Sequence, residues 1–131
     1  MLKRSRPLSP FLHYRWQYTN TLSILHRATG IILAGGFLLL VYWLTAIASG
    51  PVAYARASRV LSHPSFNVLL AFGLVAFAYH FCNGIRHLLW DAGFGLERRE
   101  ARRSGWVVAV ATVLIIVLVG CVVFIWSPGI L

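Results

Sequence analysis

The sequence predicts an all-α integral membrane protein with three transmembrane helices and no separate soluble domain. Of its 131 residues, 59% are hydrophobic and only 11% are charged, whereas a soluble domain carries about 25% charged residues. Its long apolar segments can each cross a hydrocarbon core of about 30 Å. We therefore expect residues 1–131 to form a single membrane-anchor domain, with spans near residues 22–48, 66–90 and 106–126.

The N-terminal half of the chain begins with a basic and aromatic segment, residues 1–20, which we expect to lie at the membrane surface. Asn20 or Thr21 can provide the N-cap of the first span. This span should end before Gly50–Pro51, because this pair disfavours a continuing helix. Residues 52–64 are then expected to form a short polar loop with, at most, a helical turn.

The C-terminal half contains two further predicted spans joined by a basic segment. Gly93 and Gly95 follow the second span and favour the end of a helix. Residues 96–104 are predicted to form a loop. The third span carries no charged side chain, and Trp106 and Trp126 suit the two membrane interfaces.

Positive charge is distributed unevenly around the spans. The side that includes the N-terminus has nine basic residues: Lys3, Arg4, Arg6, Arg15, Arg27, Arg98, Arg99, Arg102 and Arg103. The other loop has only Arg56 and Arg59. The positive-inside rule therefore places the N-terminus inside, on the cytoplasmic side.

The distribution of charge and the positions of the cysteines disfavour two classes of function. The net charge of +9 lies beside apolar segments instead of on a basic face with interleaved aromatic residues, so we expect no nucleic-acid partner. Cys82 and Cys121 belong to no Cys-x-x-Cys-His sequence, which excludes the usual covalent attachment of haem.

Ionisable side chains gather at the end of the second span, in residues 78–91 (AYHFCNGIRHLLWD). On a helix, His80, Gly84, His87 and Asp91 form one stripe. Ionisable groups cost at least a few kcal/mol each inside a bilayer, so they usually face protein, water or a cofactor. His80 lies about 16 Å deeper than Asp91, near the middle of the membrane.

An imidazole at that depth can ligate a metal or haem, relay protons, or bond a neighbouring carbonyl. We favour haem, because cationic donors for its propionates lie at one edge of the membrane: His26, Arg27, Arg86 and His87. His80 and His87 differ by about 10.5 Å of helix rise and cannot bind opposite faces of one iron. The single methionine is Met1. A haem would thus take its second axial ligand from another polypeptide, which makes this chain half of a heterodimeric anchor bundle.

Ser23 and Arg27 suggest a second site at the start of the first span. A hydroxyl and a guanidinium one turn apart can bond a carbonyl oxygen and stabilise developing negative charge, which suits a quinone. Arg27 can equally set topology or bind a phospholipid. Asp91 can pair with Arg86 or Arg27, or supply protons to the quinone. Small residues that allow a helix or flat ligand to come close continue this face: Gly30, Ala34, Gly35 and Gly36.

Three segments of the chain resemble the cytochrome b subunit of succinate dehydrogenase, one of two membrane anchors of respiratory complex II. They are RPLSPFLHYR (6–15), SILHRATG (23–30) and HFCNGIRHLLWD (80–91). The resemblance implies that His80 is one axial ligand of haem b and that a His of the companion anchor is the other. It implies that Ser23 and Arg27 contribute to the ubiquinone site. It also implies that His26, Arg27 and His87 lie near the haem propionates.

The resemblance further implies a larger complex. A flavoprotein subunit and an iron–sulphur subunit would dock on the basic inner face and pass electrons from succinate to ubiquinone or menaquinone. Because no long N-terminal extension typical of a mitochondrial precursor is evident, we expect the bacterial inner membrane. Two alternatives stay open at this point: a structural anchor that binds no haem, and the anchor of a fumarate reductase.

Overall fold

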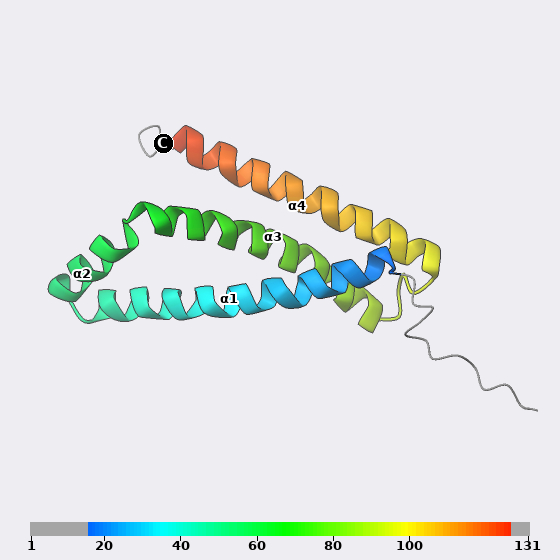
Figure 1. The fold of residues 1–131 in the computed structure, drawn as a ribbon, viewed down its shortest axis with the longest axis horizontal. Helices are drawn as coiled ribbons and strands as arrows, with labels where there is room; N and C mark the ends of the chain where they lie inside the picture. Colours follow the sequence, from blue (N-terminus) through cyan, green and yellow to red (C-terminus); the bar gives the residue numbers. More distant parts are fainter. Residues whose placement is uncertain (1–15, 127–131) are drawn as a thin grey trace, which may run out of the picture.

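The computed structural model describes residues 16–126, which form α1 (Tyr18–Ala48), α2 (Pro51–Leu61), α3 (Pro64–Asp91) and α4 (Arg98–Trp126). Helices α1 and α3 run antiparallel and are joined by the short α2, while α4 crosses beside them and diverges toward its C-terminal end (Figure 1). Helices α1, α3 and α4 are long and apolar enough to cross a membrane. The predicted all-α class with three spans is confirmed. Most of the predicted surface segment, residues 1–20, lies outside the described residues.

The first helix begins earlier than the sequence predicts. Gln17 is the N-cap residue of α1 and makes no capping bond with its side chain. Thr21 is already inside the helix, where its hydroxyl accepts a hydrogen bond of 2.7 Å from the Trp16 indole. The expectation that Asn20 or Thr21 caps this helix is therefore wrong, because an aromatic side chain from the preceding segment uses the Thr21 oxygen.

The polar segment after the first span is more helical than predicted: the expected loop with a helical turn at YARASRVL (54–61) is the 11-residue helix α2. Pro51 occupies the first turn of α2, where its missing N–H leaves no bond unmade. Gly50 precedes it with a φ of 100°, a conformation that favours glycine. Helix α2 therefore forms the connection between α1 and α3.

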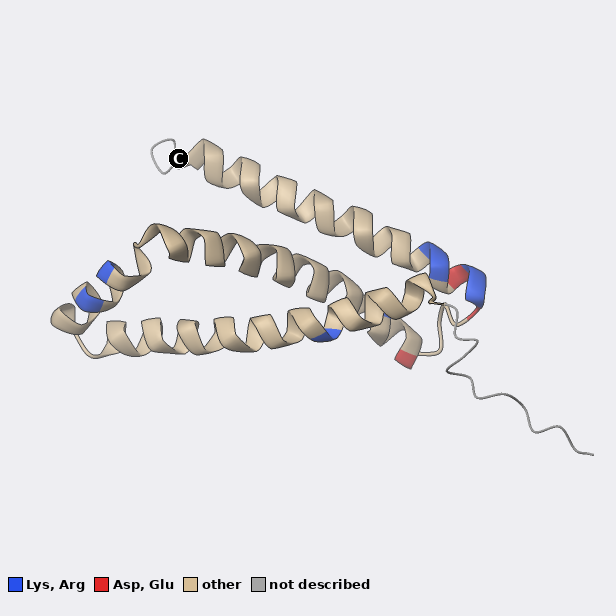
Figure 2. Cartoon of the chain, viewed as in Figure 1, with Lys and Arg blue, Asp and Glu red and all other residues tan. Residues whose placement is uncertain are grey.

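The basic segment after the second span is also helical, against the prediction of a loop. The chain turns at Gly93 and Gly95, which have φ of 85° and 73°. Arg, Ala and Glu, all good helix formers, follow at residues 98–103 and begin α4. The positive charges after α3 are thus carried on the first turns of α4, at the end of the molecule opposite α2 (Figure 2).

The buried part of the chain lies mainly where α4 starts and α3 ends. The buried residues of α1, α3 and α4 are Leu22, Ala46, Ala76, Ala78, Asn83, Arg86, Gly105, Val108 and Thr112. Gly105 lets α1 approach α4, because a Cβ atom there would lie 2.8 Å from Leu22 Cδ1 and 2.8 Å from Tyr18 Cε1. Most other large apolar side chains are exposed, as expected for helices that contact lipid or another bundle.

Replacing Gly105 should loosen this three-helix end. In Gly105→Val the new side chain would collide with Leu22 and the Tyr18 ring, so we expect a loss of about 1–3 kcal/mol, as for other overpacked sites. Gly120→Val is the matched control, because no atom lies within 4 Å of a Cβ at that position of the same helix. Thermal unfolding of the full chain in detergent measures both. Equal stability of the two variants would contradict the packing described here.

Candidate functional site

The two sequence motifs of α1 and α3 meet in a column of imidazole rings. His26 of α1 stacks on His80 of α3, with ring centroids 4.0 Å apart and planes inclined by 11°. The ring centroids of His26 and His87 are 4.9 Å apart, with planes inclined by 39°. Three predicted site residues that are distant in sequence are thus brought together.

Glycines on both helices face the neighbouring histidines, and Gly30 permits the tighter of the two contacts. A Cβ atom at Gly30 would lie 3.1 Å from Cε1 of His80, tighter than ordinary van der Waals contact. A Cβ at Gly84 would lie 3.9 Å from Cε1 of His26. Part of the predicted small-residue strip therefore receives a histidine of the neighbouring helix. No atom lies within 4 Å of the Cβ positions of Gly35 and Gly36, which remain open.

The His80 ring is held through its Nδ1 atom. Nδ1 lies 3.1 Å from the backbone carbonyl oxygen of His26 and 3.2 Å from Oγ1 of Thr29. A carbonyl oxygen can only accept, so Nδ1 carries the proton and donates it. Nε2 of His80 then has a free lone pair, and it makes no hydrogen bond within residues 16–126. This is the form in which imidazole binds a metal.

The described residues supply one ligand of this kind, not a complete metal centre. No group of three or more His, Cys, Asp or Glu side chains within residues 16–126 is arranged to hold a metal ion. The stacked rings of His26 and His80 turn their faces, not their nitrogens, toward each other. Nδ1 of His26 is buried and has no hydrogen-bond partner among the described residues. A buried nitrogen without a partner is unusual in native proteins, so the site has unused bonding capacity.

A polar pocket of about 430 Å³ lies beside the histidines, between the start of α1 and the end of α3. It is lined by Gln17, Thr19, Asn20, Ser23, Arg86, His87 and Trp90. The predicted residues Ser23 and His87 thus face one cavity. Arg27 is exposed next to it and donates a long hydrogen bond of 3.4 Å to the Ser23 hydroxyl. A hydroxyl and a cation are therefore available together to a polar ligand at this membrane edge.

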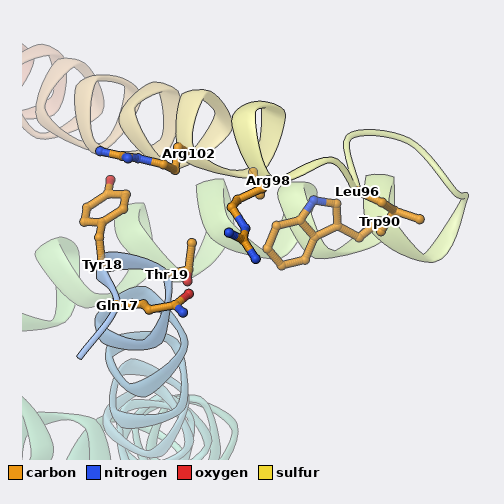
Figure 3. Close-up of a pocket in the computed structure, with 8 residues that line it drawn as sticks. Gln17, Tyr18, Thr19, Trp90, Leu96, Arg98 and Arg102 are labelled. Atoms are coloured by element: carbon orange, nitrogen blue, oxygen red, sulfur yellow. The ribbon is translucent and has the colours of Figure 1, made fainter. Parts of the chain in front are cut away.

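A second pocket, of about 580 Å³, adjoins the first one and shares Gln17, Thr19 and Trp90 with it. Two arginines of α4 line it, with Arg98 extending toward Thr19 and the Trp90 ring and Arg102 toward the Tyr18 hydroxyl (Figure 3). This pocket lies farther from the histidines than the first. Its contribution is electrostatic, because it gives this end of the bundle a positive surface that favours anionic partners.

Arg86 is largely occupied by contacts within the chain. It is only 4% exposed, and it donates to Ser104 Oγ at 2.9 Å, to Asn83 Oδ1 at 3.2 Å and to the Ala101 carbonyl at 2.9 Å. Its guanidinium also lies 3.9 Å from the Trp90 ring centre. Two of these three hydrogen bonds join α3 to α4, the third stays within α3, and two of the five N–H groups of the guanidinium have no partner among the described residues.

Asp91 is exposed at the end of α3. Its predicted ion pair with Arg86 or Arg27 does not form within residues 16–126. The reason is that Arg86 turns toward α4 and finds neutral acceptors there. The carboxylate is left facing solvent at the rim of the bundle.

Two contacts of the site were not anticipated from the sequence. Thr29 contacts His80, and the Tyr79 hydroxyl donates to the Leu22 carbonyl at 2.8 Å, which fastens α3 to α1 one turn before His26. Thr29 follows His26 by three residues and therefore shares its helix face, which is the signal that could have identified it.

Comparisons with known proteins identify the family of this chain. The profile of the family described as "Succinate dehydrogenase/Fumarate reductase transmembrane subunit" matches residues 3–120. The cytochrome b556 subunit of succinate dehydrogenase from Rickettsia typhi is 40% identical over 114 residues, covering 86% of this chain and 89% of the relative. The subunit of that name from Paracoccus denitrificans is 37% identical over 123 residues, covering 93% and 95%. The mitochondrial cytochrome b560 subunit of Sus scrofa is 40% identical over 118 residues, covering 86% and 69%. The chain therefore belongs to the family of succinate dehydrogenase and fumarate reductase transmembrane subunits.

Proposed function

We propose that this chain anchors a succinate:quinone oxidoreductase in the bacterial inner membrane, binds haem b together with a second anchor subunit, and contributes to the quinone-reduction site. The observation that carries the proposal is the position of His80 Nδ1, 3.1 Å from the His26 carbonyl oxygen, which favours the tautomer whose Nε2 can bind a metal. The names of the relatives, cytochrome b556 and cytochrome b560, support a haem in such a subunit.

The residues present fit haem b. His80 would bind the iron through Nε2, and the second axial ligand would be a His of the companion anchor, since this chain offers no second converging imidazole among its described residues. His26, Arg27 and His87, with the two remaining N–H groups of Arg86, would receive the propionates. When bound, haem b supplies a reversible one-electron store. The protein's own part is to hold the ring, exclude water and neutralise the propionate charge.

The pocket that contains Ser23 suits the carbonyl end of a quinone. The Ser23 hydroxyl and the Arg27 guanidinium would hydrogen-bond one carbonyl oxygen, and the positive charge of Arg27 would stabilise that oxygen as electrons arrive. Reduction to the quinol takes up two electrons and two protons. Exposed Asp91, at the same end of α3, is placed to take protons from water for this purpose.

The basic end of the bundle would face the cytoplasm and receive the soluble subunits. The arginines of the first turns of α4 create a positive surface there, next to the quinone pocket (Figure 2). The flavoprotein and iron–sulphur subunits would oxidise succinate and deliver electrons close to Ser23. The family description covers fumarate reductases as well, and these proteins run the same chemistry in the opposite direction.

Removing the His80 imidazole should remove the haem. We expect His80→Ala to abolish most of the haem in the purified complex, because the iron loses one of two axial bonds. The reduced-minus-oxidised spectrum and the ratio of haem to flavin measure this. His63→Ala is the matched control, since His63 is the N-cap residue at the far end of α3 and its side chain bonds only Ser65 among the described residues. Unchanged haem in His80→Ala, or no haem in the unmodified complex, would favour a purely structural anchor.

Removing the Ser23 hydroxyl or the Arg27 guanidinium should lower quinone reduction and leave succinate oxidation intact. Ser23→Ala and Arg27→Gln should lower quinone reduction about 10- to 100-fold, the value of one hydrogen bond to a charged group. Succinate oxidation with a water-soluble artificial acceptor should persist, because the soluble subunits are intact. Ser58→Ala and Arg56→Gln on α2, at the other end of the bundle, are controls. Parallel loss of both activities would indicate failed assembly and count against the quinone role.

A further inference from the structure

We infer that Thr29 is a positioning residue for His80: its hydroxyl and the His26 carbonyl together fix the tautomer and orientation of the imidazole, and so set how strongly Nε2 donates to iron. The inference rests on the proposed role of His80 as a haem ligand. It assigns a role to Thr29 of α1, a residue that would not bind the iron and does not line the pocket that contains Ser23.

The hydrogen bonds around Thr29 determine the direction of its contact with His80. Thr29 Oγ1 lies 2.8 Å from the Leu25 carbonyl oxygen and 2.9 Å from the His26 carbonyl oxygen. Its single proton satisfies one of these two acceptors. The oxygen therefore presents a lone pair to Nδ1 of His80 at 3.2 Å, and Nδ1–H has two oxygen acceptors.

The opposite tautomer is disfavoured by the same distances. With the proton on Nε2, the bare Nδ1 lone pair would face the lone pairs of the His26 carbonyl at 3.1 Å. The Thr29 proton would then have to leave both helix carbonyls to compensate. In a membrane no water replaces a lost partner, so this arrangement is costly.

Steric contacts fix the ring plane on which Thr29 acts. His26 stacks on one face of His80, and Gly30 allows Cε1 to approach α1 closely. Thr29 is β-branched and bonds its own helix, so its hydroxyl has little rotational freedom. The Thr29 hydroxyl oxygen, as acceptor, and the Nδ1–H group of His80, as donor, are therefore both held in fixed positions.

The consequence is electronic as well as geometric. A strong acceptor on Nδ1–H increases the electron density at Nε2, and this stabilises the more positive, oxidised iron more than the reduced iron. Losing the Thr29 oxygen should therefore move the haem midpoint potential in the positive direction. It should also weaken haem retention by about tenfold, the lower end of the effect of outer partners on metal affinity.

The test uses the purified complex with Thr29→Val, which keeps the shape and removes the hydroxyl, and Thr29→Ser, which restores it. Thr45→Val is the matched control on α1, because the Thr45 hydroxyl bonds only its own helix. The measurements are the haem midpoint potential, the low-spin electron paramagnetic resonance signal and the rate of haem loss. We expect a positive potential shift and altered g-values in Thr29→Val, and values close to the unmodified complex in the other two variants.

Several results would overturn the inference. One is a Thr29→Val complex whose potential and resonance signal match those of the unmodified complex. Another is an equal shift in Thr29→Ser, because the hydroxyl would then not be responsible. If Thr29→Val fails to assemble, Thr29→Ala is measured against Thr29→Ser by the same criteria. Haem that persists in His80→Ala would instead disprove the proposed function, whatever the Thr29 variants show.

Discussion

The close approach of α1 and α3 at Gly30 is the constraint on which the rest of the site depends. Because Gly30 has no side chain, the His80 ring comes near enough to α1 for its Nδ1 to reach the His26 carbonyl at 3.1 Å. That bond decides which nitrogen of His80 stays free, and the stacking of His26 on His80 follows from the same approach. A larger residue at position 30 would disturb the tautomer, the ring plane and the access to Nε2 together.

Positive charge serves two separate purposes in this bundle. Arg86 is buried, and its bonds to Ser104 and to the Ala101 carbonyl hold the start of α4 against the end of α3. Each of these partners is neutral, so no carboxylate offsets the positive charge of the guanidinium next to the pocket that contains Ser23. The exposed arginines of α4 contribute positive charge at longer range, at the end of the bundle opposite α2. Arginine thus contributes both to the packing of α3 against α4 and to the positive charge of the surface.

The sequence was sufficient for some features and insufficient for others, for physical reasons. Hydropathy reports whether a segment can cross a membrane, so the number of spans followed from it. Ionisable residues are rare in lipid, so His80 and His87 stood out in α3. Helix starts were less predictable: α1 begins at Tyr18 and α4 at Arg98, both before the first residue of the predicted span, because hydropathy does not report how far a helix extends beyond the membrane. The bonds of Arg86 depend on how α4 crosses α3, and no spacing within one helix contains that information.

The proposed haem site would need a second subunit, for two physical reasons. A single imidazole with a free Nε2 leaves an iron half ligated, and a bundle of three long helices with one compact end has large apolar faces left for another protein. Both needs are met when a second anchor subunit supplies the other axial His. A haem held from both sides would then bind the assembled pair more tightly than either chain alone, so haem binding would stabilise assembly by mass action. In this arrangement, the His26 carbonyl and the Thr29 hydroxyl of α1, which hold the His80 ring, would also contribute to holding the two subunits together.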